Sequence, residues 1–301
     1  MTLRKKAQDV GFVALRIEGG ILPAEFLQKV VSLKATDQKA SDYRLPKGPT
    51  IKDEIGRAWR IASAEWREFK DCCQRTDIDL QKVGVDGWLR VLLKVVLGHE
   101  DLVEVGSQLL DEREFPITHF STANAVPVVL STCEFQLDKG DAKFGEPGRK
   151  RSSHSLVQEF LNASDAHLWG IVSNGFLLRL LRDNPSLTKP AYIEADLERI
   201  FEEELYPDFA ALWLLFHSSR FLPRSGRVEH CIIEDWREEA FKTGERALAN
   251  LREGVEKALI QLGNGFLHHK SNALLLSALQ SGELSKEDYF RELLRLVYRL
   301  L

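Results

Sequence analysis

The residues best suited to contact a ligand lie in a basic segment near the middle of the chain. Lys143, Arg149, Lys150 and Arg151 follow one another closely there, among several glycines. Clustered cations suit contacts to phosphate, and glycine lets a backbone come close to a ligand. The segment predicts a loop that contacts the DNA backbone, and a solvated loop without a ligand is the alternative.

Acidic residues around this segment are weaker candidates for catalysis. Asp111, Glu114 and Glu134 could hold Mg²⁺, and Lys139 could assist a water molecule that the metal activates. Charged turns carry carboxylates of this kind routinely. A glutamine stands two positions after Glu134, where a metal-dependent nuclease needs a lysine, and Lys139 is out of register. We therefore assign no catalytic residue and expect Mg²⁺ only if the segment is a nuclease.

The pattern of apolar residues predicts helices on both sides of a region of strands. Helices are expected at 22–33, 51–73 and 88–97, followed by strands within 102–120 and at 126–130. A loop at 138–153 leads to a helix at 155–161, a hairpin that turns at Asn174-Gly175 and a strand near 192–195. A long helix around 209–216 and further helices after 235 complete the chain. The predicted fold class is α+β and mainly helical.

The order of elements in residues 102–181 resembles the α/β core of restriction-endonuclease-like nucleases. In that core, carboxylates on two neighbouring strands hold Mg²⁺, and the next helix often turns a polar residue toward the nucleic acid. Gln158 or Glu159 would occupy that position here. Because the lysine of the catalytic pattern is missing, the resemblance implies a nuclease-like core with a degenerate active site.

The composition excludes several classes of protein. Hydrophobic residues make up 44% and charged residues 29% of the 301 residues, and the net charge is −4. A chain that is basic overall is excluded, but a local basic patch is not. Four cysteines are too few for a disulfide framework, and neither a signal peptide nor a membrane-spanning stretch is apparent. We expect a cytoplasmic protein without a membrane partner.

Three regions are expected along the chain. A helical region covers residues 1–100, the nuclease-like core covers 101–232, and a second helical region covers 233–301. Ser285 and Asp288 have the spacing of a capping box that opens the last helix. This helix carries an apolar stripe and has no glycine, asparagine or proline to end it. We expect the chain to be part of a longer protein.

The stretch from Ser153 to Arg220 carries the most specific pattern, with blocks at 153–162, 167–175 and 178–184. Shorter stretches of the same kind lie at 19–23, 88–93, 115–119 and 292–301. Together they resemble the N-terminal region of large bacterial adenine-specific DNA methyltransferases of the type IIG-like restriction-modification kind. That family includes methylases of phage-defence systems such as DISARM. The resemblance covers nearly the whole chain and implies that residues 233–301 lead toward a methylase domain that is absent here.

The motifs of methyl transfer itself are missing from the sequence. Members of the family bind S-adenosylmethionine at a glycine-containing strand–loop motif and hold the flipped adenine with Asn-Pro-Pro-Tyr/Phe. The only Asn-Pro here is Asn184-Pro185, and Ser186 follows it in place of a second proline. The resemblance therefore implies S-adenosylmethionine only in the absent methylase domain and no cofactor in these residues.

Three functions remain open from the sequence. The first is the non-catalytic N-terminal part of a DNA adenine methyltransferase, which would contact double-stranded DNA and scaffold the methylase domain or other defence-system subunits. Its DNA contacts would be the four cations of the basic segment and Gln158. The second is a Mg²⁺-dependent DNA endonuclease domain that uses the acidic residues and Lys139. The third is a partner-docking module without a nucleic-acid role.

Overall fold

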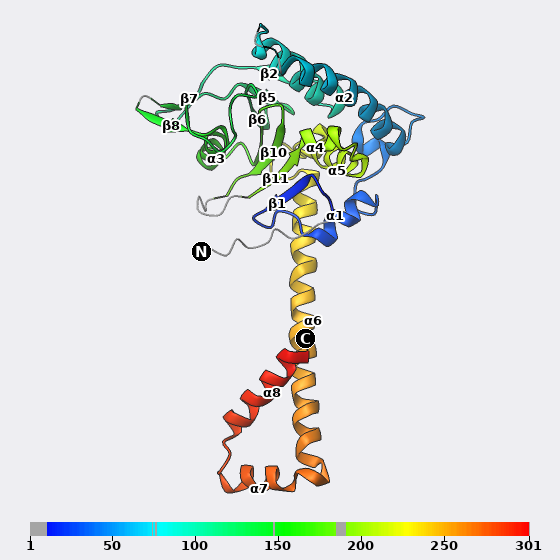
Figure 1. Ribbon diagram of the computed structural model, residues 1–301, viewed down its shortest axis with the longest axis vertical. Coiled ribbons are helices and arrows are strands. Elements are labelled where there is room, and N and C mark those ends of the chain that lie inside the picture. Colours follow the sequence, from blue (N-terminus) through cyan, green and yellow to red (C-terminus); the bar gives the residue numbers. More distant parts are fainter. Residues whose placement is uncertain (1–10, 74, 76, 147, 185–190, 301) are drawn as a thin grey trace. The chain divides into compact units, whose positions relative to one another are not determined.

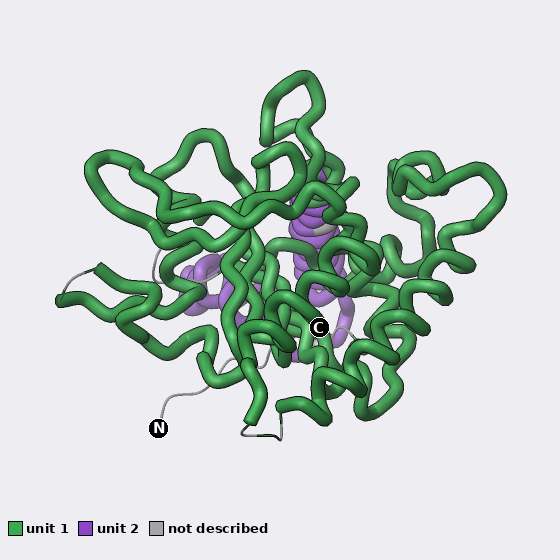
Figure 2. Tube along the Cα trace, turned by 90° about the horizontal axis from the view of Figure 1, so that it is seen from above, with its two compact units in different colours: residues 1–238 green, residues 239–301 purple. Residues whose placement is uncertain are grey.

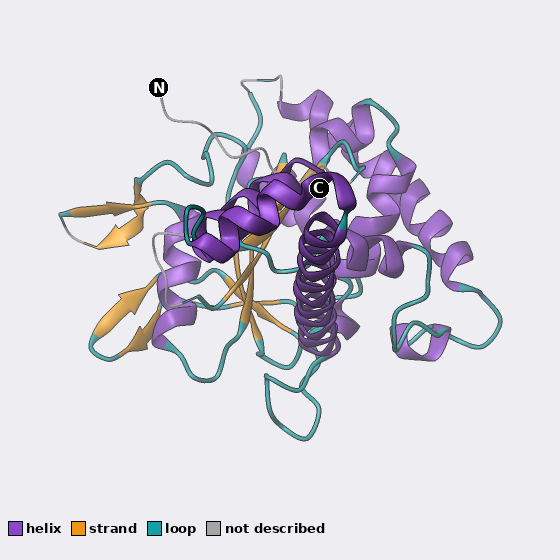
Figure 3. Cartoon of the chain, turned by 90° about the horizontal axis from the view of Figure 1, so that it is seen from below, coloured by secondary structure: helices purple, strands orange, loops and turns teal. Residues whose placement is uncertain are grey.

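The computed structural model describes residues 11–73, 75, 77–146, 148–184 and 191–300. Two compact units divide the chain, residues 1–238 and residues 239–301 (Figure 2). The sequence predicts three regions with a boundary near residue 100, but the first hundred residues belong to the same unit as the central strands. Helices and strands are both abundant in the structure (Figure 3), which confirms the α+β fold class.

A seven-stranded mixed sheet forms the centre of the first unit. Its strand order is β1-β11-β10-β9-β6-β5-β2. All neighbours are antiparallel except β6 and β9, the pair that α3 (Ser153–Ala163) connects as a crossover helix. The strands are β1 (Leu15–Glu18), β2 (Val103–Glu104), β5 (His119–Ser121), β6 (Val126–Leu130), β9 (Trp169–Ser173), β10 (Leu177–Arg182) and β11 (Tyr192–Asp196).

The predicted hairpin joins β9 to β10. Gly175 has a φ of 90°, a conformation that glycine adopts without strain. Asn174 stabilises the turn through its side chain. Its Oδ1 accepts hydrogen bonds from the backbone N–H groups of Phe176 and Leu177 at 3.1 and 2.9 Å.

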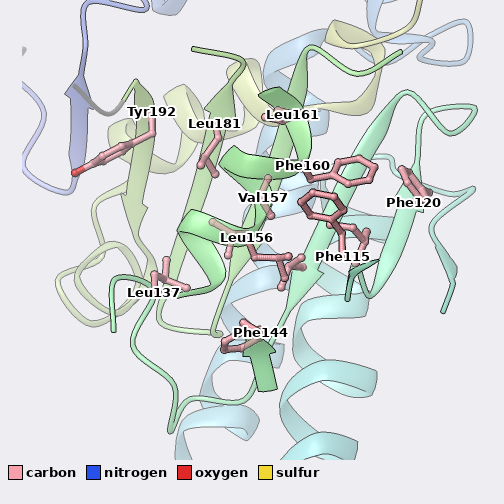
Figure 4. Packing of buried hydrophobic residues seen from close by; sticks show 13 residues of the cluster. Phe115, Phe120, Leu137, Phe144, Leu156, Val157, Phe160, Leu161, Leu181 and Tyr192 are labelled. Carbon is pink, nitrogen blue, oxygen red and sulfur yellow. The ribbon is translucent and has the colours of Figure 1, made fainter. Parts of the chain in front are cut away.

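Helix α3 packs against one face of the sheet and closes the main hydrophobic cluster of this region. Figure 4 shows Phe160 of α3 beside Phe115, with Leu156 of α3 and Leu181 of β10 in the same cluster and Phe144 at one end of it. Gly170 on β9 permits the close approach, since a Cβ there would lie 2.6 Å from Cγ1 of Val157. In Figure 1, helices α2, α4 and α5 lie on the other side of the sheet.

The helices of the first unit match the predictions closely, with two differences. Helix α2 (Ile51–Cys73) has the predicted bounds. The long helix expected around 209–216 is divided into α4 (Leu197–Glu202) and α5 (Tyr206–Phe216), because Pro207 starts a new helix after Glu204, whose φ is 51°. The third predicted helix begins earlier than expected. The remaining elements are α1 (Ala24–Val31), η1 (Ala40–Tyr43), η2 (Gln81–Leu89), η3 (Leu92–Val96) and η4 (Ser218–Arg220).

Two short β-ribbons project from the sheet region. Residues 138–153, expected to form a loop, contain the ribbon of β7 (Asp141–Glu146) and β8 (Arg149–Arg151). The second ribbon pairs β3 (Gln108–Leu110) with β4 (Arg113–Phe115), so Glu114 lies on a strand and Asp111 lies in the turn between the two strands. No alternation of apolar residues marks the β7–β8 ribbon, so its sequence looks like that of a loop.

The second unit is helical, as the sequence predicts. Helix α6 (Ile232–His268) runs into it, followed by η5 (Lys270–Asn272), α7 (Ala273–Ser281) and α8 (Lys286–Leu300). The Ser285 hydroxyl accepts the backbone N–H of Asp288 at 3.0 Å, which confirms the predicted cap of α8. The hydroxyl of Tyr289 donates to the carbonyl of Gly263, and Leu293 is buried. Within the described residues, no helix is both long and apolar enough to span a membrane.

Candidate nucleic-acid interface

The β7–β8 ribbon is fixed to the rest of the first unit through its apolar side. Phe144 is buried and lies in the cluster with Leu137 and Leu156 (Figure 4). Gly145 serves the ribbon itself, because a Cβ at this position would collide with the backbone carbonyl of Arg149 on the paired strand. The sequence assigned the glycines of this segment to ligand approach, whereas this one is required by strand pairing.

A buried arginine fixes the segment that leads into strand β7. Arg179 on β10 is 2% exposed and binds both carboxylate oxygens of Asp138, at 2.7 and 3.0 Å. Its Nε also donates to Glu194 on β11 at 2.8 Å, and Nη1 donates to Nδ1 of His154 at 2.9 Å. These hydrogen bonds, with the charge of Arg179, keep the pKa of Asp138 below its usual range. The carboxylate therefore stays ionised and tied to the sheet.

A carboxylate on α3 gathers the arginines of the two ribbons. Glu159 pairs with Arg113 at 2.7 Å, with Arg149 at 3.1 Å and with Arg151 at 3.3 Å. Arg151 also pairs with Glu146 at 2.7 Å. Three guanidinium groups thus share two carboxylates, and the excess positive charge remains at the ribbon surface.

The lysines of the ribbon are differently placed from its arginines. Lys139, Lys143 and Lys150 are exposed, and none forms an ion pair with another described residue. The ammonium of Lys143 lies 5.0 Å from the ring centroid of Phe135, a cation–π contact that restricts the side chain while leaving its charge exposed. These lysines are the cations that an incoming anion can reach without breaking an internal pair.

The charge of the ribbon is opposite in sign to that of the chain. Residues 139–151 contain five basic and two acidic residues, a net charge of +3, whereas the whole chain carries −4. A two-stranded ribbon is also one of the two elements that the major groove of B-DNA admits. The exposed cations of the β7–β8 ribbon can therefore contact phosphate groups while the ribbon itself is held in place by the first unit.

Two of the five predicted DNA contacts point inward. Arg151 is 2% exposed and is held by the two glutamates, while Gln158 is buried and donates to Asn162 at 2.8 Å. Neither side chain is presented at the surface. Lys143, Arg149 and Lys150 are exposed, and the side chain of Arg149 is 59% accessible.

The acidic candidates for catalysis do not share one site. Asp111 lies in the β3–β4 turn, and Glu114 lines a small cavity beside the β7–β8 ribbon. Glu134 lines another cavity near Cys73, in the turn after β6. Among the described residues, no three His, Cys, Asp or Glu side chains lie close enough together to hold a metal ion. The Pro185-Ser186 pair lies outside the described residues.

The sequence predicts Glu159 only as an alternative to Gln158 facing the nucleic acid, and its pairing with arginines could not be predicted. Arg113 and Glu159 lie 46 positions apart, and only the fold brings them together. The sequence predicts a role for Lys139 only in catalysis, although its exposed ammonium adds to the positive charge of the ribbon. No family model matches this sequence, and neither the curated proteins nor the solved structures contain a match.

Proposed function

We propose that this chain is the non-catalytic N-terminal part of an adenine-specific DNA methyltransferase of a restriction-modification or phage-defence system. In this role it acts in the cytoplasm, contacts double-stranded DNA and scaffolds the methylase domain or other subunits of the system. S-adenosylmethionine belongs to the methylase domain and not to these residues. A restriction-endonuclease-like core with a degenerate active site in the central region is part of the same proposal.

The observation that carries the DNA-contacting role is the basic ribbon. Its exposed lysines form no ion pair with another described residue, and its arginines exceed the carboxylates that bind them. Phosphate contacts need such cations on an element that keeps its shape. The methyltransferase assignment is supported by the sequence patterns at 153–162, 167–175 and 178–184, which lie on α3, β9 and β10.

The scaffolding role is supported by the surface of the second unit. Leu248 on α6, Leu274 on α7 and Phe290 on α8 are 68%, 86% and 51% exposed. Phe290 also lines one hollow with Ile260, which is 56% exposed, and contiguous exposed apolar surface is typical of a site that another protein covers. A methylase domain or a partner subunit is the occupant that the proposal assigns to them.

The test is binding of the purified chain to duplex DNA at two salt concentrations, with and without Mg²⁺. We expect retention of intact DNA that weakens steeply as salt rises, because binding to phosphates releases counterions. Cleavage that requires Mg²⁺ and is lost in Glu134→Ala would replace the proposal with the endonuclease alternative. No binding at either salt concentration would leave the partner-docking module as the function.

A further inference from the structure

A cavity of the first unit, apart from the ribbons, has the features of a binding site. It has a volume of about 900 Å³ and is lined by residues of the segments 43–57, 94–101 and 217–222. No residue of the β7–β8 ribbon lines it. Cavities of this size hold small organic ligands, and their specificity comes from a few polar groups in fixed positions.

One such polar group is the imidazole of His217. The hydroxyl of Ser219 accepts from Nε and Nη2 of Arg220, at 3.1 and 3.0 Å, so its own proton is free for Nδ1 of His217 at 2.8 Å. The backbone N–H of Ser219 also points at Nδ1, at 3.3 Å. Nδ1 is therefore the acceptor, and the proton of the neutral ring sits on Nε2.

The Nε2–H group of His217 has no partner. The residue is 6% exposed and lines the cavity, yet Nε2 makes no hydrogen bond with any described residue. Its ring is fixed between Tyr43 and Trp213, with centroid distances of 5.4 and 4.7 Å. Gly98 keeps the approach open, since a Cβ there would lie 2.7 Å from Nε2. In the described part of the chain, Nε2 is not among the fully buried polar atoms that lack a partner, so this donor faces the cavity, where a ligand can reach it.

Three cationic side chains without a carboxylate partner in the described part of the chain lie near this donor or line its cavity. Arg220 is fully buried and donates to the backbone carbonyls of Asp37 and Asp42, with no carboxylate paired to it among the described residues. Arg44 and Lys94 line the cavity and also lack an ion-pair partner there. Burial, followed by the charges of His99, Arg220 and Arg44, lowers the pKa of His217 to about 3, so the ring is a neutral donor near pH 7.

Two of the three acidic residues of the cavity are already engaged, Glu54 by Arg57 of the same lining and Asp101 by backbone N–H groups. Asp101 accepts the backbone N–H groups of Thr122 and Ala123, at 2.9 and 2.6 Å. Glu100 is the remaining carboxylate, and it is exposed. The lining that is free to bind a ligand thus favours an anion.

We propose that this cavity binds a phosphate group, held by Nε2–H of His217 and by the side chains of Arg44 and Lys94. The phosphate belongs to a phosphorylated small molecule or to a nucleic-acid backbone. The site does not depend on the DNA contacts of the ribbon, which lie on other elements.

The test is titration of the intact chain with inorganic phosphate by isothermal calorimetry. The wild-type chain binds phosphate saturably, and Lys94→Gln combined with Arg44→Gln weakens binding at least about tenfold, the loss expected for charge-assisted hydrogen bonds. Arg60→Gln is the matched control, since this exposed arginine lies on α2 outside the cavity. His217→Phe keeps an aromatic ring, removes the donor and produces a similar loss.

Two results would overturn the proposal. One is the absence of saturable phosphate binding to the wild-type chain at millimolar concentrations. The other is equal phosphate affinity in the wild type and in the Arg44/Lys94 variant, whose exposed and half-buried side chains can change without unfolding the protein. Competition by duplex DNA identifies the source: displacement of phosphate assigns the site to a nucleic-acid backbone, and its absence assigns it to a small molecule.

Discussion

The guanidinium of Arg179 holds both carboxylate oxygens of Asp138, and this pair ties strand β10 to the segment that enters the basic ribbon. The same guanidinium lies 4.2 Å from the ring centroid of Tyr192 and binds Glu194 on the neighbouring strand. The ribbon is therefore attached at its entrance by Asp138 and at its exit by Arg151. The sheet therefore holds in position the ribbon that carries the exposed cations.

Loss of Arg179 should destabilise the fold more than loss of Asp138. Arg179→Met leaves Glu194, whose side chain is 12% exposed, without its cation and should lower the free energy of unfolding by about 3 kcal/mol. Asp138→Asn should cost about 1 kcal/mol or less, because that side chain is 72% exposed. Urea unfolding of both variants measures the difference, and equal losses would contradict the role of the buried pair.

The stability of the first unit should fall as the pH falls below about 6.5, the usual pKa of histidine in an unfolded chain. Burial and then the charge of Arg179 lower the pKa of His154 to about 4, and burial lowers that of His99 to about 4. The unfolded chain binds these protons first, so stability is complete above pH 6.5 and is lost progressively toward pH 4.

The variant His154→Gln tests this pH dependence. Glutamine can accept the hydrogen bond from Arg179 but does not titrate, so the loss of stability between pH 7 and pH 5 should shrink by about 2 kcal/mol. Urea unfolding at the two pH values gives the comparison. An unchanged pH dependence in the variant would show that His154 is not a neutral, half-buried acceptor of the hydrogen bond from Arg179.

Glu159→Gln should change stability and DNA binding in opposite directions. The variant releases Arg113 and Arg149 from an internal carboxylate and should raise DNA affinity about threefold, a typical size for surface charge effects. It also removes a partner of the buried Arg151 and should destabilise the fold by about 2 kcal/mol. Glu112→Gln removes the same charge on the neighbouring ribbon without releasing an arginine. A rise in affinity that is no larger for Glu159→Gln than for this control would contradict the account.

Cys73 and Cys133 should form a disulfide when the protein is oxidised. Their sulfur atoms lie 3.5 Å apart, one at the end of α2 and the other in the turn after β6. Burial, and then the contact with Cys133, raises the pKa of Cys73 to about 12, so its thiol should react slowly with alkylating agents. Treatment with diamide followed by peptide mass spectrometry should find the 73–133 link. A link through Cys72 instead would show that the pairing is wrong.

Elements marked by local patterns could be predicted from the sequence. Helix α2 has its predicted bounds because the proline- and glycine-containing segment before it cannot continue a helix, and the β9–β10 hairpin follows from Asn174-Gly175. The pairing of β1 with β11 could not be predicted, since Leu15 and Ala195 are far apart in the sequence and β1 has only four residues. The ribbon was missed because pairing and ion pairs hold it, with Phe144 as its single buried aromatic residue.

The candidate interface could be predicted only in part, for a similar reason. Composition identified the basic segment, and Lys143, Arg149 and Lys150 are exposed as a DNA contact requires. The burial of Arg151 depends on Glu159, which lies on the face of α3 that the ribbon approaches. Local sequence cannot distinguish a cation paired inside the fold from one that is free at the surface. The Nε2–H donor of His217 could not be predicted from the sequence either, because the position of its proton depends on hydrogen bonds with Ser219 and Arg220 in the folded chain.

The salt dependence of duplex-DNA binding in a ribbon variant decides whether the lysines of the ribbon contact DNA phosphates. Lys143→Gln combined with Lys150→Gln should reduce the slope of log K against log salt concentration by about 1.8, or about 0.9 for each phosphate that a lysine no longer neutralises. The matched control is Lys52→Gln combined with Lys82→Gln, which removes two exposed lysines outside the ribbon and should leave the slope unchanged. The same slope in the ribbon variant and in the wild type would contradict the account.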